Sequence, residues 1–135
     1  MEFKRVVVTG LGMVTPLGND VTTTWENLLA SKSGAGNITH FDASKFKTQF
    51  ACEVKNLDVS SLFDPKELRR YDRYIHLAIH SAEQAIQDAG ICVENEDALR
   101  CGVIFGSGMG GIHTLDIKRN RLFDAVEVVV ETGAR

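Results

Sequence analysis

The stretch from Asp64 to Gly90 most constrains how this chain can fold, because its sequence predicts a long helix with one face of small and apolar side chains. Asp64 is a favoured N-cap residue, Pro65 suits the first helical position, and Glu67 completes a capping-box pattern. Gly90 is a natural helix end, because glycine readily adopts the left-handed conformation. One face carries small or apolar side chains at helical spacing: Leu68, Tyr71, Ile75, Ala78, Ala82, Ala85 and Ala89. Alanines let a neighbouring backbone approach closely, so we predict a helix packed between layers of a larger fold.

Three apolar runs predict strands. Residues 6–8 are all valine, and residues 101–105 and 126–130 are also rich in apolar side chains. Such runs are typical of strands that are buried on both faces in α/β proteins. Gly10 and Gly12 follow the first run, and we interpret them as a tight turn that needs positive φ. The sequence therefore predicts an α/β fold.

Two further helices and one short strand complete the prediction. A helix is expected over about residues 21–31, because apolar side chains recur there at helical spacing behind Asn19 or Asp20, either of which can cap it. Residues 112–124 are expected to be helical, and residues 49–54 are expected to form a short strand.

Composition and side-chain spacing exclude several classes of function. A net charge of −3 over 135 residues gives no overall electrostatic reason to expect nucleic acid as a partner. No apolar run approaches the length of a membrane span. Cys52, Cys92 and Cys101 lack disulfide-framework or zinc-knuckle spacing, so we expect reduced, buried thiols in a cytoplasmic protein. His76 and His80 stand four residues apart, but without HExxH or an evident third ligand they predict no metal site.

The glycine-rich segment at residues 106–111 supports one alternative. Gly106, Gly108 and Gly111 match the G-x-G-x-x-G pattern of dinucleotide-binding loops, after a predicted strand and before a possible helix. Glu131 follows Gly111 by about the 20 residues at which an acid meets a ribose hydroxyl. A small Rossmann-like nucleotide-binding module is therefore one possible function.

A basic cluster opens the long helix and has two interpretations. It consists of Lys66, Arg69, Arg70 and Arg73. Glu67 and Asp72 lie among these residues and could make it a solvated face with internal salt bridges. The other interpretation is a docking surface for an acidic partner.

Several motifs in order resemble one family, the type II β-ketoacyl-acyl-carrier-protein synthases. The resemblance begins with the strand, TGxG and Pro-x-Gly-Asn order of residues 5–19 and the following Trp25. It continues through Phe41-Asp42, KELRRYDR at residues 66–73, AIQDAG at residues 85–90 and GSGMGG at residues 106–111. Because it ends near Ile112, we expect a partial synthase domain over residues 1–112 and a divergent tail over residues 113–135.

The resemblance implies a fold and a chemistry. The fold would be part of the N-terminal half of a thiolase-like, layered α/β/α/β/α structure, which is homodimeric in the family. The activity would be condensation of malonyl-acyl-carrier protein with acyl-acyl-carrier protein in fatty acid biosynthesis. It requires a cysteine nucleophile and two histidines, and neither a cofactor nor a metal.

The resemblance also assigns residues. It implies that Gly106, Gly108 and Met109 lie beside the acyl-chain pocket, and that Lys66, Arg69 and Arg70 dock the acyl carrier protein. The Thr-Ala-Cys context of the family's nucleophile is absent, and its histidines belong to a later portion. We therefore expect no catalytic residue here and no activity of the chain alone, with a non-catalytic carrier-protein binder as a further alternative.

Overall fold

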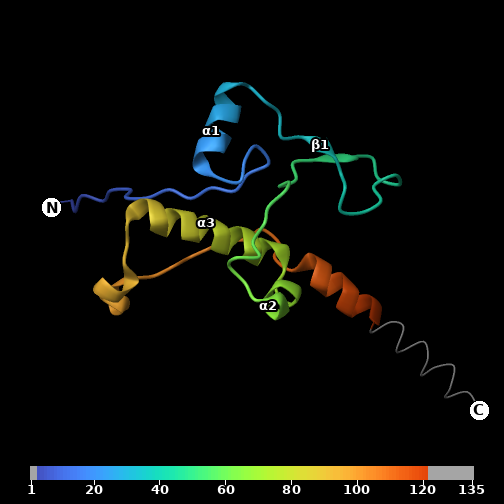
Figure 1. Ribbon diagram of the computed structural model, residues 1–135. Helices are drawn as coiled ribbons and strands as arrows, with labels where there is room; N and C mark the ends of the chain where they lie inside the picture. Colours follow the sequence, from blue (N-terminus) through green and yellow to red (C-terminus); the bar gives the residue numbers. More distant parts are fainter. Residues whose placement is uncertain (1–2, 122–135) are drawn as a thin grey trace, which may run out of the picture.

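The computed structural model describes residues 3–121, and one long helix organises them (Figure 1). In chain order the elements are α1 (Val21–Leu29), β1 (Gly36–Asn37), β2 (Phe50–Ala51), α2 (Pro65–Arg70), α3 (Arg73–Ala89) and the 3₁₀ turns Val93–Asn95 and Ala98–Arg100. Residues 112–121 are also helical. The amino-terminal segment follows one side of α3 (Figure 1). Within residues 3–121, no helix is long and apolar enough to cross a membrane.

Helix α1 confirms the helix expected over residues 21–31, although it ends two residues earlier than expected. Asp20 is the N-cap residue, and its carboxylate accepts hydrogen bonds from the Thr23 amide and hydroxyl, each at 2.7 Å. The Thr24 side chain is buried and its hydroxyl lies 3.2 Å from the carbonyl oxygen of Gly18. These local bonds attach α1 to the turn that precedes it.

The helix expected over residues 64–90 forms as two helices, so the expectation of one continuous helix is wrong. The capping box is present, because the Asp64 carboxylate accepts from the Glu67 amide while the Glu67 side chain accepts from the Asp64 amide. Gly90 ends α3 with a φ of 62°, as predicted. Tyr71 and Asp72 adopt extended backbone conformations and separate α2 from α3. Aspartate favours such helix-start positions, but no glycine or proline signals the break.

The short strand expected over residues 49–54 appears as β2, which pairs antiparallel with β1. Gly36 faces Ala51 and Asn37 faces Phe50 in this two-stranded sheet. Beyond it, the Glu53 carboxylate accepts hydrogen bonds from the Thr39 amide at 3.0 Å and the Thr39 hydroxyl at 2.7 Å. These bonds from Thr39 to Glu53 hold the two segments together beyond the last backbone pair of β1 and β2.

The strands predicted over residues 6–8 and 101–105 do not form, and these predictions are wrong for the described chain. Val6 is 90% exposed and Ile104 is 98% exposed. A strand needs a hydrogen-bonding neighbour, and within residues 3–121 neither run has one. The predicted α/β sheet is therefore replaced by helices and one small sheet. The strand expected over residues 126–130 lies outside the described residues.

The amino-terminal segment is held against α3 instead. The Leu11 amide donates to Asp88 Oδ2 at 2.8 Å, and the Met13 amide donates to Gln84 Oε1 at 3.2 Å. Gly12 makes this approach possible, because a Cβ there would collide with the Ser81 carbonyl group.

This close approach corrects the role that we predicted for the first glycine pair. The glycines with positive φ in the described chain are Gly90 and Gly111, so Gly10 and Gly12 are not needed for a left-handed turn. A Cβ on Gly10 would meet the backbone at Ala85 and Ala89. The prediction that the alanine face of α3 admits a neighbouring backbone is thereby confirmed.

The described chain has very little interior. Its buried hydrophobic side chains are Ala43, Val59 and Phe63. Helix α3 buries none of its residues fully, and Phe105 beside it is 56% exposed. Much apolar surface along α3 and the adjoining extended segments therefore remains uncovered.

Candidate functional site

An apolar cavity lies along α3 where the segment before the glycine-rich loop passes it. Its volume is about 420 Å³, within the range of small-molecule sites. Its lining is Tyr74, Ile75, Leu77, Ala78, Ser81, Phe105, Gly106 and Ser107. Four of these side chains are purely hydrocarbon and the rest present few polar atoms. The cavity is therefore suited to an apolar group.

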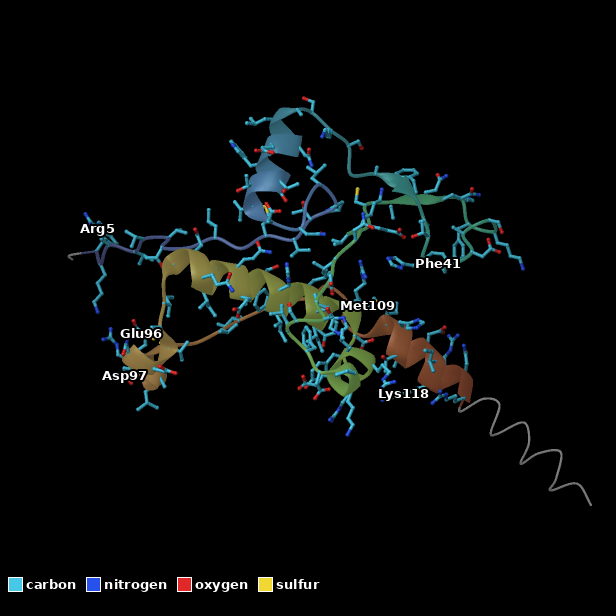
Figure 2. All side chains as sticks on the ribbon, in the orientation of Figure 1. Arg5, Phe41, Glu96, Asp97, Met109 and Lys118 are labelled. Carbon is cyan, nitrogen blue, oxygen red and sulfur yellow. The ribbon has the colours of Figure 1, made fainter. Side chains whose placement is uncertain are left out.

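A second cavity of about 230 Å³ continues toward the start of α3. Its lining is Asp72, Arg73, Tyr74, Leu77, Met109, Gly111, Ile112 and His113. Tyr74 and Leu77 line both cavities, so the two share a wall on α3. Figure 2 shows Met109 near the end of α3 at which α2 and the helical segment 112–121 meet.

The residues predicted to shape a pocket are distributed over these cavities. Gly106 lines the larger one, and Met109, a residue that is 71% exposed, lines the smaller one. Gly108 lines neither cavity. Sequence reasoning missed Tyr74 and Leu77, which lie beside the predicted alanine-rich face and not on it.

The glycine-rich segment lacks the setting of a dinucleotide loop. A helix does follow it from residue 112, but residues 101–105 form no strand before it. The Rossmann motif requires that strand, because the loop joins it to the helix. Glu131 lies outside the described residues. This geometry gives nucleotide binding no support.

Helix α2 presents Lys66, Arg69 and Arg70 to solvent. Within residues 3–121, none of these cations forms an ion pair. The two acids among them are engaged elsewhere, since Glu67 completes the capping box and Asp72 accepts from the Thr114 hydroxyl at 2.6 Å. The described contacts therefore favour a surface available to an acidic partner over a network of internal salt bridges.

The α2–α3 junction contacts three separate segments. Arg73 donates through Nη2 to the Val54 carbonyl oxygen at 2.6 Å, and Asp72 bonds to Thr114. The Phe63 ring meets Tyr71 edge-on at 6.0 Å between ring centroids and His76 at 5.0 Å. Sequence reasoning missed these contacts. Asp72 and Arg73 of this junction also line the cavity that Met109 lines.

The cysteines differ from expectation. Cys52, Cys92 and Cys101 were predicted to be small buried hydrophobes, but all three are exposed as free thiols. The reason is that the segments carrying them have no covering layer within residues 3–121. None of them begins an α-helix, where the dipole would favour a thiolate.

The two helix histidines are partly buried on α3. His76 Nε2 and His80 Nδ1 are shielded from solvent and have no hydrogen-bond partner within residues 3–121. In that same part of the chain, no group of three or more His, Cys, Asp or Glu side chains could hold a metal ion. The spacing of His76 and His80 therefore has no supporting ligand among the described residues.

Local hydrogen bonds lower the pKa of four carboxyl groups, of which three belong to exposed residues and one, that of Glu53, is partly buried. The amide and hydroxyl of Thr23 lower the pKa of Asp20, and the hydroxyl and amide of Thr39 lower the pKa of Glu53. The amides of Ser44 and Ser60 lower the pKa of Asp42 and of Asp58 respectively. All four groups lie in caps and turns outside the cavities, so their role is local structure.

Comparison with known proteins identifies the family. Residues 3–132 match the family model described as the N-terminal domain of β-ketoacyl synthase. This match continues beyond residue 112, and the expected domain boundary there stays a prediction.

Relatives named 3-oxoacyl-[acyl-carrier-protein] synthase 2 are similar over most of this chain. The one from Coxiella burnetii is 49% identical over 112 residues, which are 83% of this chain and 27% of the relative. The one from Synechocystis is 42% identical over 124 residues, which are 92% of this chain and 30% of the relative. The chain thus spans less than a third of the length of these relatives.

A solved ketosynthase structure has a similar fold. The ishigamide ketosynthase/chain length factor superposes with a TM-score of 0.59 and 31% identity, over 66% of this chain and 22% of that chain. From the sequence match and the shared fold it follows that the chain belongs to the β-ketoacyl synthase family, and that its match lies in the family's N-terminal domain.

Proposed function

We propose that this chain is the N-terminal portion of a 3-oxoacyl-acyl-carrier-protein synthase of fatty acid biosynthesis, and that it is inactive alone. The observation that carries the proposal is the 42–49% identity to relatives of that name, over less than a third of their length. The complete protein would condense malonyl-acyl-carrier protein with acyl-acyl-carrier protein in the cytoplasm.

Two surfaces of the chain would take part. The larger cavity along α3, which Gly106 lines, and the smaller one, which Met109 lines, would contribute to the wall around the acyl chain. The exposed Lys66, Arg69 and Arg70 of α2 would meet the acidic acyl carrier protein, and their lack of ion pairs within residues 3–121 supports this role.

The complete fold would be thiolase-like, with α/β/α/β/α layers. Residues 6–8 and 101–105 are largely apolar and exposed and form no helix or strand, as expected of strands whose sheet neighbours belong to another part of the protein. Covering them would also bury the exposed side of α3. The uncovered apolar surface therefore supports a larger layered structure.

The chemistry explains the expected inactivity. A cysteine thiolate attacks the acyl thioester and releases the carrier thiol; the malonyl unit then loses CO₂, and its carbanion attacks the acyl-enzyme and frees the cysteine. The first step requires a thiol activated by a helix dipole or a nearby histidine. Cys52, Cys92 and Cys101 are exposed in segments without an α-helix start.

A composite synthase tests the proposal. Residues 1–132 of this chain are joined to the remaining part of the Coxiella burnetii relative, and condensation of malonyl- with acyl-carrier protein is measured. We expect condensation by the composite. We expect no acyl adduct on the isolated chain by mass spectrometry. A folded but inactive composite, or an adduct on any of the three cysteines, would contradict the proposal.

The carrier-docking role has its own matched test. In the composite, Arg69→Glu with Arg70→Glu should raise the KM for acyl-carrier protein at least about tenfold, since charged contacts across interfaces contribute at that level. Lys45→Glu with Lys47→Glu changes the net charge equally at another exposed site and should leave the KM within about twofold. If both double substitutions change the KM equally, α2 is not part of the docking surface. Carrier binding without condensation would favour a non-catalytic binder.

A further inference from the structure

The Asp72 side chain is used in an unexpected way. Asp72 occupies the N-cap position of α3, where an aspartate normally accepts a hydrogen bond from the first helical turn. Its side chain makes no such bond. Its Oδ1 instead accepts from the Thr114 hydroxyl at 2.6 Å, joining residues 42 positions apart. The partly buried Asp72 carboxylate therefore binds the helical segment 112–121 and does not cap its own helix.

The opposite oxygen of the same carboxylate faces Gly111. A Cβ built on Gly111 would lie 2.9 Å from Asp72 Oδ2, and the φ of Gly111 is +71°. The positive φ favours glycine at this position, and a Cβ there would press on the Asp72 carboxylate. The backbone of the glycine-rich segment therefore turns directly against the carboxylate, with Thr114 on one oxygen and Gly111 beside the other.

These contacts form one wall of the smaller cavity. Asp72, Gly111 and Met109 all line it. Next to them, a Cβ on Gly110 would lie 3.0 Å from the Tyr74 ring, and Tyr74 lines both cavities. A shift of the segment after Met109 relative to the start of α3 would thus change the shape of the space between them.

We propose that Asp72 is a positioning residue, which holds the segment that carries Met109 against the start of α3 through its bond to Thr114. By fixing where Met109 lies, Asp72 would set how much space the smaller cavity leaves for an acyl chain. The assignment to an acyl chain rests on the proposed function. The positioning of the segment by Asp72 does not rest on the proposed function, because it follows from the Asp72–Thr114 bond and the close approach of Gly111.

Hydrogen exchange of the full 135-residue chain tests the holding contact. Thr114→Val removes the donor and keeps the shape, whereas Thr114→Ser keeps a hydroxyl. We expect Thr114→Val to speed exchange of amides 109–115 about fivefold, as loss of one net hydrogen bond predicts, and Thr114→Ser to restore the original rate. Thr39→Val removes a comparable hydroxyl bond to Glu53 at 2.7 Å and should leave amides 109–115 unchanged. Equal exchange in the Thr114→Val variant and the original chain would overturn the proposal.

The composite synthase tests the effect on the acyl chain. The ratio of kcat/KM for octanoyl- and palmitoyl-carrier protein should change at least about threefold in Thr114→Val and return in Thr114→Ser, because pocket contacts discriminate chain length at this level. An active composite with an unchanged ratio would refute the specificity role. An original composite that never condenses would count against the proposed function, while the exchange experiment would still decide whether Asp72 holds the segment.

Discussion

Replacing Gly12 with alanine should release the amino-terminal segment from α3. A Cβ at this position would lie 2.8 Å from the Ala85 nitrogen and would collide with the Ser81 carbonyl oxygen. Both obstacles are helix backbone and cannot rotate away. The segment must therefore move outward, and the amide bonds of Leu11 to Asp88 and Met13 to Gln84 must lengthen or break.

The expected magnitude follows from those two bonds. Both are solvent-exposed, and one has a carboxylate acceptor, so together they contribute about 2 kcal/mol to docking of the segment. That free energy corresponds to about a thirtyfold change in an opening equilibrium. Amide exchange of Leu11 and Met13 should therefore speed up by about that factor in Gly12→Ala, while the amides of α1 change little.

Gly102→Ala is the matched control, because a Cβ on Gly102 meets nothing within 4 Å. It should leave the exchange of Leu11 and Met13 unaltered. If Gly12→Ala also leaves both amides unaltered in a chain with normal α-helical circular dichroism, close backbone approach is not what docks this segment.

Three other outcomes are expected. Asp64→Ala should destabilise α2 by about 1 kcal/mol through loss of its N-cap, and faster exchange of the Lys66 and Glu67 amides would report it, with Asp58→Ala as an exposed control. Hydrogen bonds from Thr39 lower the pKa of Glu53 in the folded chain. Their contribution to stability should therefore be complete above the ordinary glutamate pKa and should be lost as the pH falls through the lowered pKa of the folded chain. An NMR titration of Glu53 that is unaffected by Thr39→Val would contradict this. The isolated chain, with Ala43, Val59 and Phe63 as the buried hydrophobic residues of its described part, should bind a hydrophobic dye because much apolar surface stays exposed. Absence of dye binding would be the opposite result.

Local signals in the sequence predicted the parts of the fold that depend on neighbouring residues. Asp20, Asp64 and Gly90 act as helix ends as expected, because caps use atoms within one helical turn. The runs at residues 6–8 and 101–105 failed as strands because pairing depends on partners that propensity does not supply.

The candidate site was predictable to a similar extent. Motif order pointed to Gly106, Met109 and the basic face of α2, and the structure shows Gly106 and Met109 lining neighbouring cavities on α3. The Asp72–Thr114 bond could not be predicted, because its partners are 42 residues apart and no local pattern pairs them. The break at Tyr71 was hidden for a related reason, since that position also fits a continuous helical face.

The contact between Leu11 and Asp88 spans 77 residues of chain, which has a consequence during synthesis. At translation rates of about 5–20 residues per second, roughly 4–15 s pass between the emergence of these two residues from the ribosome. Through that interval Leu11 and Met13 have no helix to dock on, so a nascent-chain chaperone would encounter their segment before α3 does.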